Sequence, residues 1–134
     1  MSDANKQLIR RFLQRVNAGD LAVVDELVSD DFIEHEAIPG LPATKAGVRQ
    51  MFEMFQAAFA DAQFEADDVI ADGDTVSVRA RLTGTHRADF MGVPASGHSI
   101  SVGIADYFRI DDGVLVEHWG VMDTGALMQQ LAGH

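Results

Sequence analysis

The chain has 134 residues, 47% of them apolar, and no cysteine; 21 acidic and 10 basic side chains give a formal net charge of −11. This length and apolar content are typical of one domain with a hydrophobic core, and without cysteine there are no disulfides or thiolate metal sites. The negative charge disfavours nucleic acids, anionic membranes and strongly anionic substrates as partners. No apolar run suits a signal peptide or a membrane span, so we expect one cytoplasmic domain over residues 1–134.

The first half of the chain has helical periodicity. Apolar residues recur at helical spacing over Leu8–Val16, Leu21–Val28 and, most strongly, Val48–Phe59. Asp20 and Thr44 are the expected N-caps of the second and third helices. Between these helices, the segment FIEH enters a loop rich in proline and glycine. We therefore expect three N-terminal helices, the third with an aromatic stripe made of Phe52, Phe55 and Phe59.

The second half alternates between apolar and polar residues, which predicts four antiparallel strands. They are expected near residues 63–71, 76–86, 100–110 and 114–122, with a loop over 87–97 and a short closing helix over 124–131 capped by Asp123. Helices followed by a meander of strands predict an α+β domain. A strongly curved sheet would wrap around the third helix as a cone and leave an apolar pocket at its open end.

One carboxylate interrupts the apolar face of the third predicted strand. Alternate residues from Ile100 to Ile110 share one side of this strand, and Asp106 is the polar one among them. A buried carboxylate costs several kcal/mol unless it is paired or hydrogen-bonded. We therefore expect Asp106 to have a partner on a neighbouring strand.

The hairpin that follows suggests this partner. The segment IDDGV is best interpreted as a type I turn whose glycine forms a G1 bulge, and this geometry pairs Ile110 with Val114. Asp106 then lies directly opposite His118, with Cβ atoms about 5 Å apart. A two-residue loop would instead place Asp106 opposite Trp119. The bulged loop is favoured because glycine supplies the positive φ that follows a type I pair.

Two interpretations of this pair stay open. In the first, Asp106 orients His118 and raises its pKa, so that the two form a proton-transfer dyad at the floor of a pocket, with either group as the base. In the second, the pair is a self-satisfied polar island that fixes strand register. A metal site of three histidines and Asp106 is not expected, because no HxH or HxxxH spacing supports it.

Other residues are candidates for contact with a substrate. His86 shares the parity of the inward apolar residues of its strand, so it could point into the pocket near its rim. His35 precedes a proline- and glycine-rich loop, and this histidine could close the mouth. Each could equally be a surface or capping histidine. We expect both to contact polar atoms of a substrate, and we expect the apolar wall to include Phe55, Phe59 and Met122.

Several phrases of the sequence are similar to one family. DDFIEH, GTHRADFMGVPASGHSI and the hairpin DYFRIDDGVLVEHW resemble the SnoaL-like polyketide cyclases of the NTF2-like superfamily, over nearly the whole chain. The patterns GTH…F.G.P..G and Y.RI.DG.L.EHW are the most specific. The resemblance implies a cone-shaped barrel, with three N-terminal helices packed in a curved antiparallel sheet around an apolar cavity. It also implies a homodimer formed through the outer face of the sheet.

The resemblance further implies a reaction without metal or organic cofactor. Characterised family members close a ring in a polyketide methyl ester by intramolecular aldol condensation. An aspartate on the returning strand takes the carbon-bound proton, and a histidine on the preceding strand assists. Here the place of the aspartate corresponds to Gly120 and that of the histidine to Asp106, while His118 lies two residues before Gly120. The polar pair is therefore kept, with its members exchanged and shifted.

The sequence thus predicts a cofactor-independent acid/base enzyme that acts on a small, largely apolar carbonyl compound by cyclisation or isomerisation. Asp106 and His118 would be its catalytic residues. The alternative is a non-catalytic protein that binds a small molecule in the same cavity. A dimer interface is expected from the residues of outward parity, which are Tyr107, Leu115, Trp119 and Val121.

Overall fold

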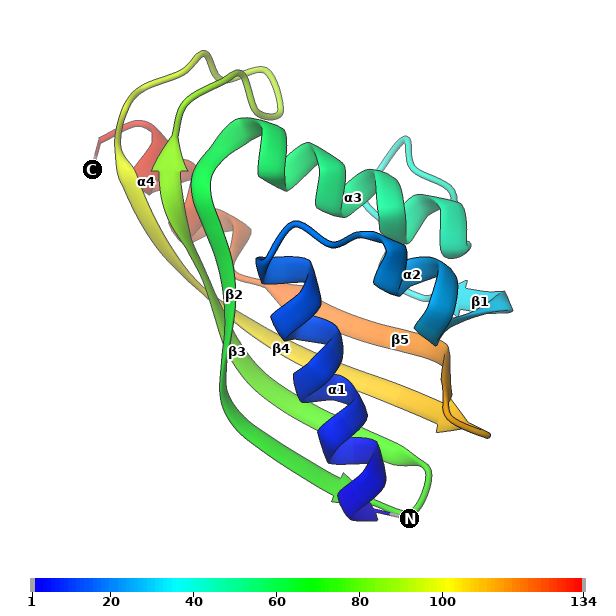
Figure 1. Ribbon diagram of the computed structural model, residues 1–134. Coiled ribbons are helices and arrows are strands. Elements are labelled where there is room, and N and C mark those ends of the chain that lie inside the picture. The colour runs from blue at the N-terminus through cyan, green and yellow to red at the C-terminus, as the bar shows by residue number, and fades with distance from the viewer. Residues whose placement is uncertain (1, 134) are drawn as a thin grey trace.

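In the computed structural model, which describes residues 2–133, helices pack inside a strongly curved five-stranded sheet (Figure 1). The helices are α1 (Ser2–Asn17), α2 (Ala22–Leu27), α3 (Lys45–Ala58) and α4 (Thr124–Leu131). The strands are β1 (Val28–Glu34), β2 (Phe59–Asp72), β3 (Thr75–His86), β4 (Ser99–Asp111) and β5 (Val114–Met122). The strand order β1-β5-β4-β3-β2 leaves the sheet open between β1 and β2. The predicted α+β fold is confirmed.

The apolar stripes of α1 and α3 meet the inner face of the sheet. Phe12 of α1 lies 6.0 Å from Phe52 of α3 between ring centroids, and Phe52 lies 5.4 Å from Phe64 of β2. These edge-on and tilted contacts tie both helices to the same side of the curved sheet. α4 begins as expected, because the Asp123 carboxylate accepts a hydrogen bond from the backbone N–H of Ala126 at 2.9 Å. None of the described helices is long and apolar enough to cross a membrane.

The segment expected to enter a loop after the second helix is instead a strand. β1 follows α2 directly and runs parallel to β5, with Ile33 beside Glu117 and Glu34 beside His118. Phe32 is buried and Ile33 is half exposed, so the side chains alternate as in any strand. The alternation covers few residues, because the register is irregular between Val28 and Ile33. Because of this irregularity, the sequence pattern alone does not indicate a strand here.

The β4–β5 hairpin also differs from the expected geometry. Asp112 and Gly113 both have positive φ, 50° and 78°, so they form a two-residue turn in place of the bulged loop. A bulge lies further along, where the register shifts beside Arg109 and Ile110 and leaves Val116 of β5 without a direct partner. The two-residue loop, the alternative that was not favoured, is therefore correct at the turn, where Ile110 lies opposite Leu115, but neither alternative gives the pairing observed at Asp106.

The bulge has two consequences for the inner face. Asp106 lies opposite Gly120 rather than opposite His118 or Trp119, so its contact with His118 is a diagonal one. Leu115 was expected to point outward, but it is 1% exposed, because the bulge reverses the side-chain parity between the turn and the rest of β5. The inward parity of His118 is kept, since it lies beyond the bulge.

Candidate active site

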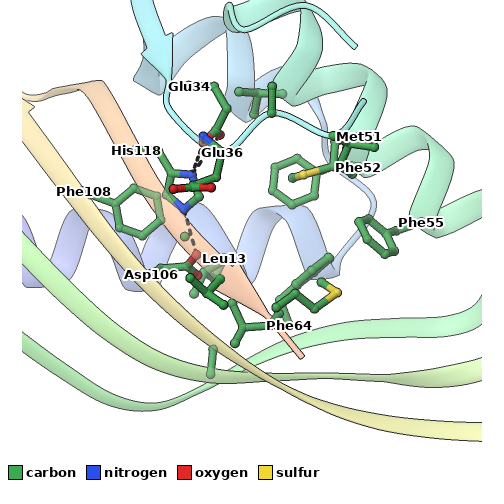
Figure 2. Close-up of a pocket in the computed structure, with 18 of the residues that line it drawn as sticks. Leu13, Glu34, Glu36, Met51, Phe52, Phe55, Phe64, Asp106, Phe108 and His118 are labelled. Atoms are coloured by element: carbon green, nitrogen blue, oxygen red, sulfur yellow. Dashed lines mark hydrogen bonds and ion pairs between the residues drawn. The ribbon is translucent and has the colours of Figure 1, made fainter. Parts of the chain in front are cut away.

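A largely apolar cavity of about 370 Å³ lies between the helices and the concave face of the sheet. Its walls come from α1, α3 and the inner faces of the strands, in the region that Figure 2 shows. The deep part is apolar, and its aromatic lining includes Phe12, Phe52, Phe55, Phe64 and Phe108. An apolar space of this size accommodates a small organic molecule.

The mouth of the cavity is marked by lining residues that are also exposed. They come from the loop after β1, the loop after β3, and the junction of β5 with α4. Apart from Glu36 these residues are uncharged: Ala37, Pro39, Met91, Val121 and Thr124. The mouth is therefore an apolar rim that carries one carboxylate, that of Glu36.

The polar end of the cavity is a histidine held between two carboxylates (Figure 2). His118 Nε2 lies 2.7 Å from Asp106 Oδ1, and His118 Nδ1 lies 2.8 and 2.7 Å from the two carboxylate oxygens of Glu34. The three side chains come from β4, β5 and β1, and each is less than one-fifth exposed, at 17%, 17% and 11% for Asp106, His118 and Glu34. The contact between Asp106 and His118 on one concave face is as predicted.

This geometry makes His118 an imidazolium. Carboxylates only accept hydrogen bonds, so both ring nitrogens of His118 must donate. Burial lowers the pKa of this ring, but the hydrogen bonds to Asp106 and Glu34, together with their charges, outweigh burial and raise the pKa from 6.5 to about 9. At neutral pH His118 therefore carries a proton on each nitrogen and has no lone pair with which to accept another.

Asp106 and Glu34 differ in how much of each carboxylate is engaged. Glu34 uses both oxygens on His118 Nδ1, and Oε2 also accepts the backbone N–H of Glu36 at 3.1 Å. Asp106 uses Oδ1 alone, and Oδ2 has no hydrogen-bond partner among the described residues. Oδ2 is not sealed in the protein either, because the sole buried, unpartnered side-chain atom among those residues belongs to another histidine. Asp106 Oδ2 is thus a carboxylate oxygen without a hydrogen-bond partner at the wall of the cavity.

Gly120 leaves the space in which the pair sits. A Cβ atom at this position would lie 2.6 Å from His118 Cε1 and 2.7 Å from Asp106 Oδ1. Real Cβ atoms do not approach other atoms so closely, so any side chain at Gly120 would displace the pair. The Asp106–His118 contact therefore requires a residue without a side chain at position 120.

Of the residues predicted for the apolar wall, Phe55 and Met122 line the cavity and Phe59 does not. Phe59 is 1% exposed and packs in the core beside Phe55 and Phe90, with ring centroids 6.3 and 5.1 Å away. Phe59 begins β2 rather than continuing α3, so its side chain leaves the stripe that faces the cavity.

His35 was expected at the mouth, but the structure places it outside the lining of the cavity. Its ring stacks on Trp119 at 4.4 Å, and its Nε2 lies 2.8 Å from Glu117 Oε2. The hydrogen bond from His35, together with the Arg109 guanidinium, lowers the pKa of the Glu117 carboxyl. His35 points to the outer face because it follows Glu34 by one position, and neighbouring side chains of an extended chain point in opposite directions.

His86 was also expected near the rim, and it too lies outside the lining. It is fully buried, with its ring 5.5 Å from that of Phe59. Its Nδ1 accepts a hydrogen bond from the backbone N–H of Ser96 at 3.1 Å and lies 2.9 Å from the Ser96 hydroxyl. Side-chain parity correctly predicted that His86 points to the inner face of the sheet, but its position near the end of β3 lies outside the cavity.

The sequence-based prediction missed Glu34. Its signal was the alternation of Phe32 with Glu34, which share the inward parity of a strand that was interpreted as a loop. Among the described residues, no group of three or more is arranged to hold a metal ion. The arrangement can instead hold a carboxylate base beside a fixed positive charge inside an apolar space.

Comparisons with known proteins agree with this fold. The family model of the SnoaL-like polyketide cyclases matches residues 7–131. No curated protein sequence matches the chain. Among solved structures, TsrD from Streptomyces laurentii is similar, with 29% identity, a TM-score of 0.88 and coverage of 98% of this chain and 97% of that one.

Two further structures are similar over nearly their whole lengths. IdmH from Streptomyces antibioticus, assigned as a polyketide cyclase, has 31% identity and a TM-score of 0.83, with 96% of this chain and 98% of that one covered. AclR from Streptomyces galilaeus, assigned as a hydroxylase, has 28% identity and a TM-score of 0.88, with 100% and 99% covered. The chain therefore belongs to the SnoaL-like polyketide cyclase family.

Proposed function

We propose that this protein is a cofactor-independent acid/base enzyme that removes a proton next to a carbonyl group in a small, largely apolar compound. Asp106 is the base, and His118 is the positioning residue that holds it. One observation carries the proposal: Asp106 Oδ1 is fixed by His118 at 2.7 Å, while Oδ2 is free toward the cavity. Glu34 holds the other side of the His118 ring and so fixes its orientation.

The proposed step moves a proton and an electron pair. Asp106 Oδ2 takes the proton from the carbon next to the carbonyl, and the electron pair of the broken C–H bond forms the enolate. The enolate carbon then attacks a second carbonyl group of the compound, which closes a ring, and protonated Asp106 gives its proton to the alkoxide that forms. In a compound whose enolate is conjugated with a double bond, Asp106 instead gives the proton to the far carbon of that system, which isomerises the compound. His118 remains an imidazolium throughout, and its fixed charge in an apolar site partly offsets the negative charge that passes to the enolate.

The apolar walls support this chemistry. They exclude water from the reacting atoms, which strengthens the electrostatic effect of the fixed imidazolium. Family membership supports an activity of the cyclase or isomerase type. Since similar structures carry names as different as polyketide cyclase and hydroxylase, the proposal rests on the site rather than on the fold.

Hydrogen–deuterium exchange tests the proton-transfer step without the natural substrate. We expect the protein to catalyse exchange of the hydrogens next to the carbonyl group of apolar ketones such as tetralone in D₂O, followed by NMR. Asp106→Asn keeps the size of the side chain but removes the base, so the rate should fall by about 10²–10⁴-fold. Asp111→Asn is the matched control, because this exposed residue lies in the same hairpin and does not line the cavity.

An equal rate for Asp106→Asn and the wild type would overturn the assignment of the base. Binding of the ketones without any exchange would favour the other candidate, a non-catalytic protein that binds a small molecule in the same cavity.

The outer face of the sheet supports a second proposal, a homodimer. Tyr107 and Val121 are 42% and 67% exposed, and Tyr107 packs edge-on against Trp119 with ring centroids 5.4 Å apart. A contiguous apolar patch of this kind is uncommon on a protein that stays monomeric. We expect light scattering at micromolar concentration to give twice the chain mass, and Tyr107→Asp to shift the protein toward the monomer, because Tyr107 is exposed on the outer face and does not line the cavity. A monomeric wild-type protein would contradict the proposal.

A further inference from the structure

The charges that line the cavity are unbalanced. Three carboxylates, Glu34, Glu36 and Asp106, face a single cation, His118, and no lysine or arginine belongs to the lining that the structure describes. The formal charge of the polar end is thus −2 at neutral pH, inside a cavity whose remaining walls are almost entirely apolar. A low-dielectric surrounding strengthens the effect of such an excess on any charged group that enters.

Glu36 is the carboxylate without a structural partner. Glu34 is held by His118 Nδ1, and Asp106 by His118 Nε2. The Glu36 side chain has no hydrogen bond or ion pair with any described residue, although its backbone N–H donates to Glu34. Figure 2 draws this side chain among those that line the cavity, and its exposure places it at the mouth.

An anionic ligand meets no suitable donor in this cavity. The cation, His118, already directs one N–H to each of its two carboxylate partners. A carboxylate group on a ligand would therefore be repelled by three acidic side chains without gaining a charge-assisted hydrogen bond. A neutral ligand meets no such penalty, and a cationic one is attracted by the unpaired charge.

From these observations we propose that the cavity selects a compound whose apolar body carries a protonated amine, with the amine held at the mouth by Glu36. The inference rests on the proposed function, since it assigns the substrate class of the same cavity. The ammonium group would stay beside the exposed Glu36, the apolar body would fill the aromatic interior, and the carbonyl group would lie deeper, beside Asp106. In this pose the ammonium group of the ligand contacts the Glu36 carboxylate, and both charged groups stay partly in water.

Three probes of similar size test this selectivity: naphthylethylamine, naphthylethanol and the naphthaleneacetate anion. They share one apolar body and differ in charge at a single end. Isothermal titration calorimetry at neutral pH and low salt should give a Kd for the amine about fivefold lower than for the alcohol, which corresponds to about 1 kcal/mol. The acetate should bind most weakly.

Substitution then locates the charge. Glu36→Gln should remove most of the advantage of the amine over the alcohol and leave the alcohol's affinity nearly unchanged. The matched control is Glu53→Gln, which changes the net charge of the chain equally but lies on an exposed position of α3 outside the cavity lining. It should keep the advantage, because a residue outside the cavity acts only through the screened field of the whole molecule.

Other outcomes overturn the inference. These are an alcohol that binds as tightly as the amine, an acetate that binds best, equal losses in Glu36→Gln and Glu53→Gln, and no binding of any probe. These measurements record binding alone, so they are separate from the exchange assay of Asp106. If the amine is not preferred but Asp106→Asn still abolishes exchange, the proposed function stands and the substrate class falls.

Discussion

Two histidines on the inner face of the same sheet have opposite surroundings. His118 on β5 has a carboxylate at each ring nitrogen and lines the cavity. His86 at the end of β3 has Ser96 at Nδ1, no partner at Nε2 among the described residues, and aromatic rings around it. Both are mostly or fully buried. What distinguishes them is the charge of their neighbours and their distance from open space.

The difference shows what turns a buried histidine into a candidate site. At His118, two negative partners stabilise the imidazolium, and the cavity gives a ligand access to one of those partners. At His86, the hydrogen bonds to Ser96 fix the end of the loop over residues 87–98, and the ring fills space in the core. Burial alone therefore does not indicate function, because both rings have it.

The pH dependence of stability should sharpen this contrast with the largest effect. The folded-state pKa of His118 is raised to about 9, above the ordinary 6.5, so the fold binds this proton more tightly than the unfolded chain does. Its contribution is fully present below pH 6.5 and is lost as the pH rises through about 9. Urea unfolding across this window should show the free energy of unfolding falling by roughly 3 kcal/mol.

Variants of both histidines assign the effect. His118→Gln should flatten the decrease, whereas His86→Leu should keep it even if the protein becomes less stable overall. In NMR titrations, the His118 ring resonance should titrate near pH 9. A ring that titrates near 6.5 would show that the two carboxylates do not hold the imidazolium as the distances indicate.

Gly120→Ala should disrupt the hydrogen bond between His118 and Asp106 although both of these residues are unchanged. The new Cβ would lie 2.6 Å from His118 Cε1 and 2.7 Å from Asp106 Oδ1, so the pair must separate. Overpacking of this kind costs about 1–3 kcal/mol, and thermal unfolding should show the loss. The His118 pKa should fall in the same variant, because its contact with Asp106 is weakened.

Gly103→Ala is the matched control on the neighbouring strand. A Cβ there would meet nothing within 4 Å, so its stability should be unchanged or slightly higher. If Gly120→Ala were as stable as Gly103→Ala, the pair would have room to move, and the tight packing inferred around it would be wrong.

Much of this site could be predicted from the sequence, for physical reasons that concern particular residues. The alternation around Asp106 marked it as an inward carboxylate, and His118 has the same inward parity on the next strand. Alternation fixes the face of a strand over short distances, which is why the contact was predicted. The pairing register of β4 with β5 was not predicted, because the two-residue turn and the bulge at Val116 each change it by one residue. Several combinations of turn and bulge are compatible with the same sequence.

Glu34 shows the other limit. It lies far from His118 in the chain, and it reaches the site through parallel pairing of β1 with β5. Parallel pairing leaves no turn between the two strands to mark it, and the irregular register of β1 obscures its period. The prediction that His86 lies near the rim was wrong for a related reason. Side-chain parity gives the face of the sheet, but the position along the cone depends on how the sheet curves.

The smallest expected effect concerns the His86 side of the comparison. Ser96→Ala removes the hydroxyl that lies 2.9 Å from His86 Nδ1, but it keeps the backbone N–H that donates to the same nitrogen at 3.1 Å. Since Nδ1 retains a partner, the loss should be about 1 kcal/mol of unfolding free energy, typical of one hydrogen bond. Ser77→Ala is the control, because Ser77 lies exposed on the same strand as His86, and it should change stability by less.

Deuterium exchange of the ketones and the decrease of stability with pH should be unaffected in both variants, because neither serine lines the cavity or contacts His118. If Ser96→Ala slowed exchange while stability stayed the same, His86 would be coupled to the reaction, and the contrast between a histidine that holds a base and one that supports the fold would fail.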